Sequence, residues 1–119
     1  MPDKKILIID DDSINIFALS AFLVPMGYKC TAALSGVQCL KILSGRPHFD
    51  YILMDIMMPE MDGIETIKQI RKIVTYKNTK IVVITADDSS ITRLKSITAG
   101  ANAVLNKPVD TEKLEKFLN

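Results

Sequence analysis

Short apolar runs alternate with longer segments of mixed polarity along the whole chain. Three of these runs, KILII, YILM and KIVVI, are nearly continuous in large apolar residues. Strands that are buried on both faces of a parallel sheet show this pattern, whereas half-exposed strands alternate between apolar and polar residues. Five strands are therefore predicted, at Lys5 to Ile9, Tyr28 to Ala33, Tyr51 to Met54, Lys80 to Ile84 and Ala103 to Leu105.

The segments between these runs carry apolar residues at helical spacing and have capping residues at their ends. The expected caps are Asp12 or Ser13, Ser35, Asp62, Asp88 or Ser89, and Asp110 at the starts, with Gly27 and Gly100 at two of the ends. Pro25 falls in the last turn of the first segment, so we expect that helix to end or bend near Val24. The predicted helices span Ser13 to Val24, Gly36 to Leu43, Ile64 to Val74, Ser90 to Thr98 and Thr111 to Leu118.

Five strand-helix repeats with short connections predict one α/β domain over residues 1–119. Its core is expected to be a doubly wound, five-stranded parallel sheet with helices on both faces and right-handed crossovers. The flavodoxin-like strand order 2-1-3-4-5 fits this pattern. The chain stops about two turns into its last helix, which favours a domain cut from a longer protein. Ligands of such sheets bind outside the carboxyl ends of the strands, so functional residues are sought there.

Composition narrows the class of protein further. The 119 residues carry 15 Lys and Arg against 14 Asp and Glu, a net charge of +1, so neither a nucleic acid nor a membrane surface is an expected partner. Cys30 and Cys39 have no metal-binding spacing, and we expect both to be buried free thiols in a reducing cytosol. No signal peptide or membrane span is apparent, so a soluble, cytoplasmic protein is expected.

Polar residues directly follow four of the five predicted strands. They are Asp10, Asp11 and Asp12 after the first, Asp55 after the third, Thr85 after the fourth, and Asn106 and Lys107 after the fifth. Each has an ordinary structural explanation by itself: the triple aspartate can cap a helix, and Asp12 is expected to do only that. Asp55 is different, because a carboxylate at the mouth of the core is costly unless something pairs with it.

Taken together, these residues indicate a metal and phosphate site. Asp10, Asp11 and Asp55 would repel one another and raise their pKa values unless a divalent cation lay between them. Carboxylates, a backbone carbonyl from the loop after Asp55, and phosphate oxygens are ligands typical of Mg²⁺. The Thr85 hydroxyl and the Lys107 ammonium suit the remaining oxygens of a phosphoryl group. The pattern therefore favours phosphorylation of Asp55.

The chain resembles the response-regulator receiver domain over essentially its whole length. The shared motifs are IIDDD, LMDIMMPEMDG, ITAD and NKP, in that order. The resemblance implies that Asp55 is the phosphoacceptor, that Asp10, Asp11, Asp55 and the Met57 main-chain carbonyl hold Mg²⁺, and that Thr85 and Lys107 contact the phosphoryl group. It also implies a cis Lys107-Pro108 bond.

The same resemblance implies how the domain works in signalling. Its partner would be a histidine kinase or a histidine phosphotransfer protein, and the domain would accept phosphate and switch conformation without turning over a small substrate. The motif wording is most similar to receivers fused to hybrid histidine kinases. Phosphorylation would draw in Thr85 and bias the surface of the fourth helix, fifth strand and fifth helix, through which a transient homodimer would form.

One departure from the family pattern concerns the readout of phosphorylation. Receivers often have Tyr or Phe three residues before the conserved lysine, and this chain has Val104 there. A valine cannot swing a ring between exposed and buried positions, so the usual aromatic readout is not expected here. Met57 and Asp87 occupy positions that tune acyl-phosphate hydrolysis in the family, and Met57→Asn is expected to change the lifetime of the phosphorylated form.

Other classes of protein remain as alternatives. A Mg²⁺-dependent phosphohydrolase of the haloacid-dehalogenase type would need an aspartate two residues after its nucleophile, where this chain has Met57. A nucleotide- or flavin-binding module would need glycines after the first strand, where this chain has DDDSIN. A pure interaction domain that has lost phosphorylation is a third alternative. The joint presence of all five polar site residues argues against it.

Two further features have simpler interpretations. The methionines at 54, 57, 58 and 61 could bind Cu(I), but packing of a loop that is punctuated by Pro59 and Gly63 is favoured. His48 has no partner in the sequence and is expected to lie in a surface loop.

Overall fold

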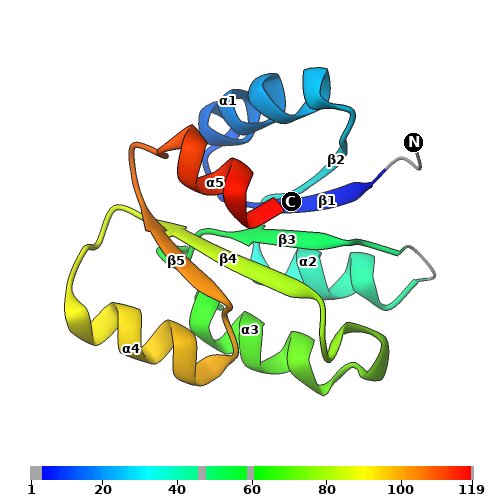
Figure 1. The fold of residues 1–119 in the computed structure, drawn as a ribbon. Coiled ribbons are helices and arrows are strands. Elements are labelled where there is room, and N and C mark those ends of the chain that lie inside the picture. Colours follow the sequence, from blue (N-terminus) through cyan, green and yellow to red (C-terminus); the bar gives the residue numbers. More distant parts are fainter. Residues whose placement is uncertain (1–3, 46–47, 59–60, 119) are drawn as a thin grey trace.

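The computed structural model describes residues 4–45, 48–58 and 61–118 of the chain. Strands and helices alternate throughout (Figure 1). The strands are β1 (Lys5–Ile9), β2 (Lys29–Ala33), β3 (Tyr51–Met54), β4 (Lys80–Thr85) and β5 (Ala103–Asn106). The helices are α1 (Ser13–Leu23), α2 (Gly36–Leu43), α3 (Gly63–Lys72), α4 (Ser90–Ala99) and α5 (Thr111–Leu118), with 3₁₀ turns η1 (Val24–Met26) and η2 (Val74–Tyr76).

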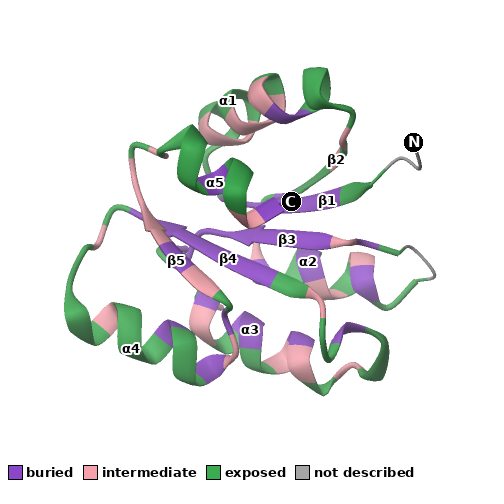
Figure 2. Ribbon diagram, in the orientation of Figure 1, coloured by how far each residue is buried: buried purple, intermediate pink, exposed green. Residues whose placement is uncertain are grey.

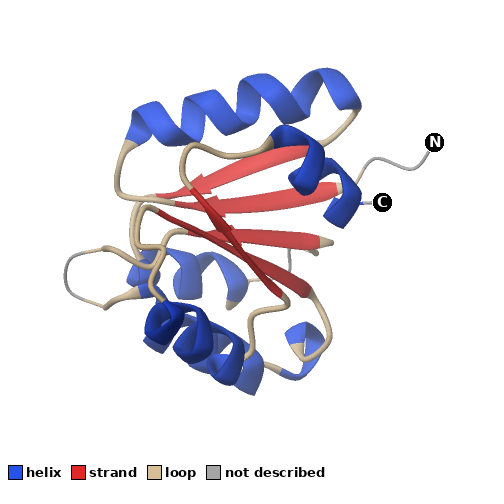
Figure 3. Ribbon diagram, turned by 60° about the vertical axis from the view of Figure 1, so that its left-hand side comes forward, coloured by secondary structure: helices blue, strands red, loops and turns tan. Residues whose placement is uncertain are grey.

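The five strands form one parallel sheet in the order β2-β1-β3-β4-β5, as the sequence predicted. Figure 3 shows this sheet between two layers of helices. Alternate residues of each strand face opposite layers: Leu7 and Ile9 belong to the cluster packed with α2, α3 and α4, whereas Ile6 and Ile8 belong to the cluster packed with α1 and α5. This two-sided burial explains why the central strands lack an alternating pattern.

The central strands are the most deeply buried part of the sheet (Figure 2). All of β3, and all of β1 and β4 except their first residues, is buried, while the edge strand β2 is largely exposed. Each helix turns one side to the sheet and the other to solvent. In α1 that inner side is only partly buried, and among its described residues Leu23 alone is fully buried. Within the described residues, no helix has the length and apolarity needed to cross a bilayer.

The predicted elements all occur, with shifted ends. β2 starts one residue late, whereas β4 extends to Thr85 and β5 to Asn106. The first helix ends at Leu23, and Pro25 lies in the 3₁₀ turn that follows, which confirms the expected break. The end predicted at Val74 is wrong, because α3 stops at Lys72 and a separate turn follows. Thr85 and Asn106 pair across β4 and β5, so the sheet itself positions both residues.

Local chemistry sets the helix ends. The side chains of Asp12, Ser35, Asp62 and Ser89 each accept a hydrogen bond from a backbone N–H in the first turn of the next helix. Asp110 accepts from Glu112 N at 3.0 Å and thereby caps α5. Gly27 (φ 97°) ends η1, and Gly100 (φ 126°) ends α4, in the region of backbone conformation that favours glycine.

Candidate functional site

The site lies at the carboxyl edge of the sheet, where β1, β3, β4 and β5 end side by side. Sheet-like hydrogen bonding continues past the strand ends and fixes the residues that follow. Asp55 N donates to Ile9 O at 2.9 Å, and Lys107 N donates to Thr85 O at 2.8 Å. The parallel register therefore brings together residues that are almost one hundred positions apart in the chain.

Three carboxylates gather at this edge. One oxygen each from Asp10, Asp11 and Asp55 lies within 4.8 Å of the others. Asp10 and Asp55 are only 3% and 6% exposed, whereas Asp11 is exposed to solvent. Hard oxygen ligands that converge at this spacing, with an open side toward water, fit Mg²⁺, which retains several of its waters in proteins. The arrangement confirms the convergence of acids that the sequence predicted.

Backbone groups hold two of these carboxylates in place. Asp12 N donates to Asp10 Oδ1 at 2.9 Å, and Met57 N donates to Asp55 Oδ1 at 3.1 Å. Each buried acid therefore has one oxygen bound to the backbone. The role of Asp12 as the cap of α1 is also confirmed, because its side chain accepts from Ile14 N at 2.9 Å.

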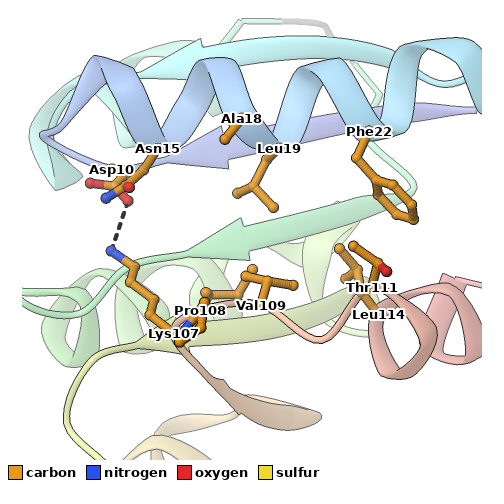
Figure 4. A pocket seen from close by; sticks show the side chains of 11 residues that line it. Asp10, Asn15, Ala18, Leu19, Phe22, Lys107, Pro108, Val109, Thr111 and Leu114 are labelled. Carbon is orange, nitrogen blue, oxygen red and sulfur yellow. Dashed lines mark hydrogen bonds and ion pairs between the residues drawn. The ribbon is translucent and has the colours of Figure 1, made fainter.

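Lys107 lies against both buried acids. Its Nζ is 3.2 Å from Asp10 Oδ2 and 3.5 Å from Asp55 Oδ2, and Figure 4 shows the side chain reaching toward Asp10. The Lys107-Pro108 peptide bond is cis, as expected. Burial opposes charge on the lysine, but the hydrogen bond to Asp10 and the negative charge of Asp55 outweigh it and raise the pKa of Lys107. The ammonium form is therefore the resident state.

The pKa of Asp55 is raised in the folded chain. Burial is the largest cause, and the nearby charge of Asp10 adds to it, while the Met57 N–H and the Lys107 ammonium act in the opposite direction. The sequence predicted this direction from mutual repulsion of the acids, but desolvation is the stronger effect. Among the described residues, one ammonium faces three carboxylates and does not neutralise them, so a further cation would lower the energy of the site.

The loop after Asp55 depends on a close approach by α3. Gly63 N donates to Ile56 O at 3.2 Å. A Cβ at position 63 would lie 2.5 Å from Ile56 Cα and 2.7 Å from the backbone oxygen of Asp55. Any side chain there would collide with the backbone that carries Asp55, which explains the glycine at the start of the helix.

Thr85 is fully buried at the end of β4, on the strand next to β3 and its Asp55. Its Oγ1 accepts a hydrogen bond from Asp87 N at 3.1 Å. Asn106, the neighbour of Thr85 on β5, donates from Nδ2 to Asp87 O at 3.3 Å. The structure therefore brings the predicted Thr85 to the same edge as the acids and adds a polar loop behind it.

A cavity of about 280 Å³ leads from the Asp10-Lys107 pair into the space between α1 and α5. Apolar side chains of α1, of α5, of β4 and of the segment between β5 and α5 line most of it, and the Asn15 side chain lies beside Asp10 at its polar end (Figure 4). Asn15 was not predicted as a site residue. In sequence it looks like any polar residue of a first helical turn, and only the fold shows that this turn starts beside Asp10.

Several minor expectations need correction. Met58 is buried and supports the packing role of the loop, but Met57 is 63% exposed, and Pro59 lies outside the described residues. His48 is exposed and lies in a loop, as expected, and its Nε2 lies 3.1 Å from Asp50 Oδ1, a contact that the sequence did not indicate. Cys30 and Cys39 are free thiols; Cys39 is buried, whereas Cys30 is only half-buried on the edge strand.

Comparison with known proteins agrees with this geometry. Residues 6–119 match the family described as the response regulator receiver domain. The chain belongs to this family. Receivers are phosphoacceptor signalling modules that are phosphorylated on aspartate with the help of Mg²⁺, and the cluster of Asp10, Asp11 and Asp55 provides an acidic pocket of that kind. The phosphohydrolase and nucleotide-binding alternatives are therefore set aside.

Individual relatives come from several kinds of signalling protein. The receiver is 37% identical to the transcriptional regulatory protein ZraR of Klebsiella oxytoca over 96% of this chain and 25% of that protein, so it spans about a quarter of that relative's length. It resembles the magnesium-containing receiver domain of sensor histidine kinase PA1611 from Pseudomonas aeruginosa (29% identity, TM-score 0.89, covering 98% and 95% of the two chains). It also resembles a chain in the co-crystal structure of the Saccharomyces cerevisiae histidine phosphotransfer protein Ypd1 with the receiver domain of Ssk1. The identity is 29% and the TM-score 0.86, and the match covers 98% of this chain and 86% of that chain.

Proposed function

We propose that residues 1–119 act as one receiver domain in which Asp55 accepts a phosphoryl group from a phosphohistidine on a kinase or phosphotransfer protein. The observation that carries the proposal is the meeting of Asp10, Asp11 and Asp55 at the sheet edge with the Lys107 ammonium 3.5 Å from Asp55. A carboxylate in this setting is buried, aligned by the backbone and beside a cation, which is what an aspartate nucleophile needs.

The transfer exchanges one bond for another. The bond between phosphorus and the imidazole nitrogen of the donor breaks, a bond between phosphorus and an Asp55 carboxylate oxygen forms, and the electron pair of the old bond stays on the imidazole nitrogen. Lys107 offers its ammonium to the phosphoryl oxygens, and Thr85 has a hydroxyl hydrogen to donate to them. These side chains contribute mainly by positioning the groups and neutralising charge.

Asp10, Asp11, Asp55 and the Met57 carbonyl are the proposed holders of Mg²⁺. The metal would supply positive charge to the carboxylates and the phosphoryl oxygens. The three acids offer oxygen ligands within 4.8 Å of one another, and Met57 lies in the loop that the Asp55 side chain binds through Met57 N. The similar receiver domain of PA1611 has a magnesium ion coordinated in its active-site cleft, which supports the same metal here.

A histidine-containing partner would dock on α1 next to the acids. Ile14 and Phe17 lie on this helix and are 75% and 74% exposed, although α1 starts directly beside Asp10. Large apolar side chains so near a charged site are typical of a contact surface. The Ypd1 complex of the similar Ssk1 receiver supports a phosphotransfer protein as the partner.

A transient homodimer through α4, β5 and α5 is also proposed, as is a cytoplasmic location. Leu94 and Ile97 are exposed apolar residues on α4 and support the contact surface. Sedimentation velocity before and after phosphorylation would test the dimer, which is expected to appear only in the phosphorylated sample.

The free thiols of Cys30 and Cys39 support the proposed cytoplasmic location, because free thiols are typical of a reducing compartment.

Intact mass after incubation with acetyl phosphate and Mg²⁺ tests the main proposal. The wild type should gain one phosphoryl group, and Asp55→Ala should gain none. Asp12→Ala is the matched control, because Asp12 belongs to the same acidic run but caps α1; it should be labelled like the wild type. Equal labelling of the wild type and Asp55→Ala would move the acceptor elsewhere, and no labelling of either protein would contradict the proposal.

A further inference from the structure

The loop between β4 and α4 is tied to its surroundings through Asp87. Its N–H donates to Thr85 Oγ1 at 3.1 Å, and its carbonyl accepts from Asn106 Nδ2 at 3.3 Å. Its carboxylate accepts from Ser89 N at 2.9 Å and from the Thr92 hydroxyl at 2.6 Å. One residue is therefore hydrogen-bonded to the end of β4, to the end of β5 and to the first turn of α4.

The contacts continue into the body of α4. The Thr92 carbonyl accepts a hydrogen bond from Ser96 Oγ at 2.8 Å, and Ser96 is fully buried on the side of α4 that faces the core. Hydrogen bonds from Thr92 and Ser89 hold the pKa of Asp87 below its ordinary value, so its carboxylate is ionised at neutral pH. Hydrogen bonds to an ionised acceptor are stronger than those between neutral groups.

This chain of contacts starts at the side chain that would meet a phosphoryl group. Thr85 Oγ1 accepts from Asp87 N, and an accepting hydroxyl still has its own hydrogen to donate. If Thr85 shifts toward a phosphoryl group on Asp55, the Asp87 N–H is bonded to the moving atom. An aromatic ring at position 104, which often reads out phosphorylation in receivers, is absent here. Residue 104 is a valine that is 5% exposed and packs in the core.

We propose that Asp87 transmits the movement of Thr85 to α4, with Thr92 and Asn106 as positioning residues, so that this receiver reads out phosphorylation through a polar chain. The inference rests on the proposed function, because it requires a phosphoryl group on Asp55. Two discrete arrangements of the loop would differ in whether the Thr85 hydroxyl donates to that group. The Thr92 hydroxyl is the contact that carries the change from the loop into the helix.

The test compares amide hydrogen exchange in α4 with and without acetyl phosphate and Mg²⁺, in protein whose phosphorylation is verified by intact mass. In the wild type, phosphorylation should change the exchange of residues 90–93. Thr92→Val removes the hydroxyl and keeps the shape of the side chain. In this variant the first turn of α4 should exchange roughly tenfold faster before phosphorylation, as expected for a lost hydrogen bond to a charged group. Its exchange should not change further on phosphorylation.

Two matched variants separate coupling from a general loss of helix stability. Thr92→Ser keeps the hydroxyl and should restore the response of residues 90–93 to phosphorylation. Thr98→Val makes the same chemical change on an exposed part of α4 outside the chain of contacts and should respond like the wild type. All three variants should be phosphorylated, because none of them alters an acid, Thr85 or Lys107. Asn106→Ala, which cuts the contact with Asp87 O, provides a second test if Thr92→Val does not fold.

The outcomes distinguish this inference from the proposed function. If the wild type is not phosphorylated, the proposed function fails and takes the inference with it. If the wild type is phosphorylated but α4 does not respond, or if Thr92→Val responds fully, only the coupling through Asp87 is overturned. Loss of the response in Thr92→Val and its return in Thr92→Ser would support it.

Discussion

The charged side chains at the two ends of the sheet differ in whether the groups around them satisfy them. At the amino end of β4 and β5, Arg71 donates from Nη1 to Tyr76 O, Lys77 O and Thr79 O and from Nε and Nη2 to Gly100 O, at 2.6 to 3.2 Å; Nη2 also reaches Asn102 Oδ1 at 3.0 Å. At the carboxyl end, within the part of the chain that the structure describes, three carboxylates meet one ammonium, that of Lys107. At the amino end, the hydrogen-bond donors of the Arg71 guanidinium are bound to oxygen atoms. At the carboxyl end, the negative charge of the three carboxylates exceeds the positive charge of Lys107.

This difference separates a structural site from a functional one. The guanidinium of Arg71 binds carbonyls that the fold already holds in place, so it connects α3 with the loops before β4 and β5 and calls for no further ligand. The carboxyl end is complete only when a cation is added, because repulsion among its acids persists in the folded chain. A charged side chain that is held by hydrogen bonds therefore does not by itself indicate a functional site, whereas like charges that are crowded together with too little opposite charge do.

Breaking the amino-end network should have the largest effect on stability. Arg71→Ala would leave several carbonyls without their donor, and we expect the free energy of unfolding to fall by about 3 kcal/mol. Arg71→Lys should recover only part of this, because one ammonium cannot reproduce the forked geometry. Urea unfolding measures both values. Phosphorylation of Asp55 at a temperature where both variants are folded should stay close to the wild-type rate, and a large loss there would contradict the separation of the two ends.

Neutralising the carboxyl end should act in the opposite direction. Because the folded chain raises the pKa of Asp55, the folded state disfavours its charge, and stability is lost as the pH rises through the folded pKa. Without Mg²⁺ at neutral pH, Asp55→Asn should therefore stabilise the fold.

Thermal unfolding in EDTA and in Mg²⁺ checks this expectation. The difference between Asp55→Asn and the wild type should shrink as the pH falls below the ordinary aspartate value of 3.8, where both states of the wild type are protonated. Added Mg²⁺ should raise the melting temperature of the wild type more than that of the variant, because it binds the folded acids. A variant that is less stable than the wild type in EDTA would contradict the expectation that the folded state disfavours the charge of Asp55.

The two ends also differ in how far the sequence reveals them. Asp10, Asp55 and Lys107 directly follow apolar runs, and the parallel order of the strands places such residues at one edge, so the carboxyl end could be predicted. Arg71 looks like an ordinary basic residue near the end of a helix. Most of its acceptors are backbone carbonyls, and these have no signature in the sequence.

Boundaries and side-chain exposure were the other points that sequence patterns could not settle. Pro25 marks the end of the first helix through its missing N–H and fixed ring, which is a local effect. The end of α3 at Lys72 depends on how the following turn packs Tyr76 into the core, which is not local. Met57 and Met58 are adjacent and chemically identical, yet only Met58 is buried, because the path of the loop decides which of them faces inward.

Within the acidic run after β1, removal of Asp12 should separate capping from metal binding. Its side chain caps α1, and its contribution to the site is a backbone N–H that donates to Asp10 and that any residue would retain. Asp12→Ala should cost about 0.5 to 1 kcal/mol of stability, the usual loss for a helix cap. The affinity for Mg²⁺, measured by calorimetry, should remain close to that of the wild type, whereas Asp11→Asn should weaken it strongly. Equal losses in the two variants would make Asp12 part of the metal site.

The smallest expected effect concerns the side chain next to the phosphoacceptor. Met57 is exposed and its N–H binds Asp55, so replacement of its side chain should alter the surroundings of the acyl phosphate without disturbing the acids. An asparagine amide at this position can hold a water molecule near the phosphoryl group, so Met57→Asn should shorten the lifetime of phosphorylated Asp55 by about threefold, less than 1 kcal/mol in the barrier. Decay of the intact-mass adduct after removal of acetyl phosphate measures this lifetime, and Met57→Leu, which is similar in size and apolar, is the control. If both variants decay like the wild type, water reaches the acyl phosphate by a route that residue 57 does not line, and the side chain at this position does not set its lifetime.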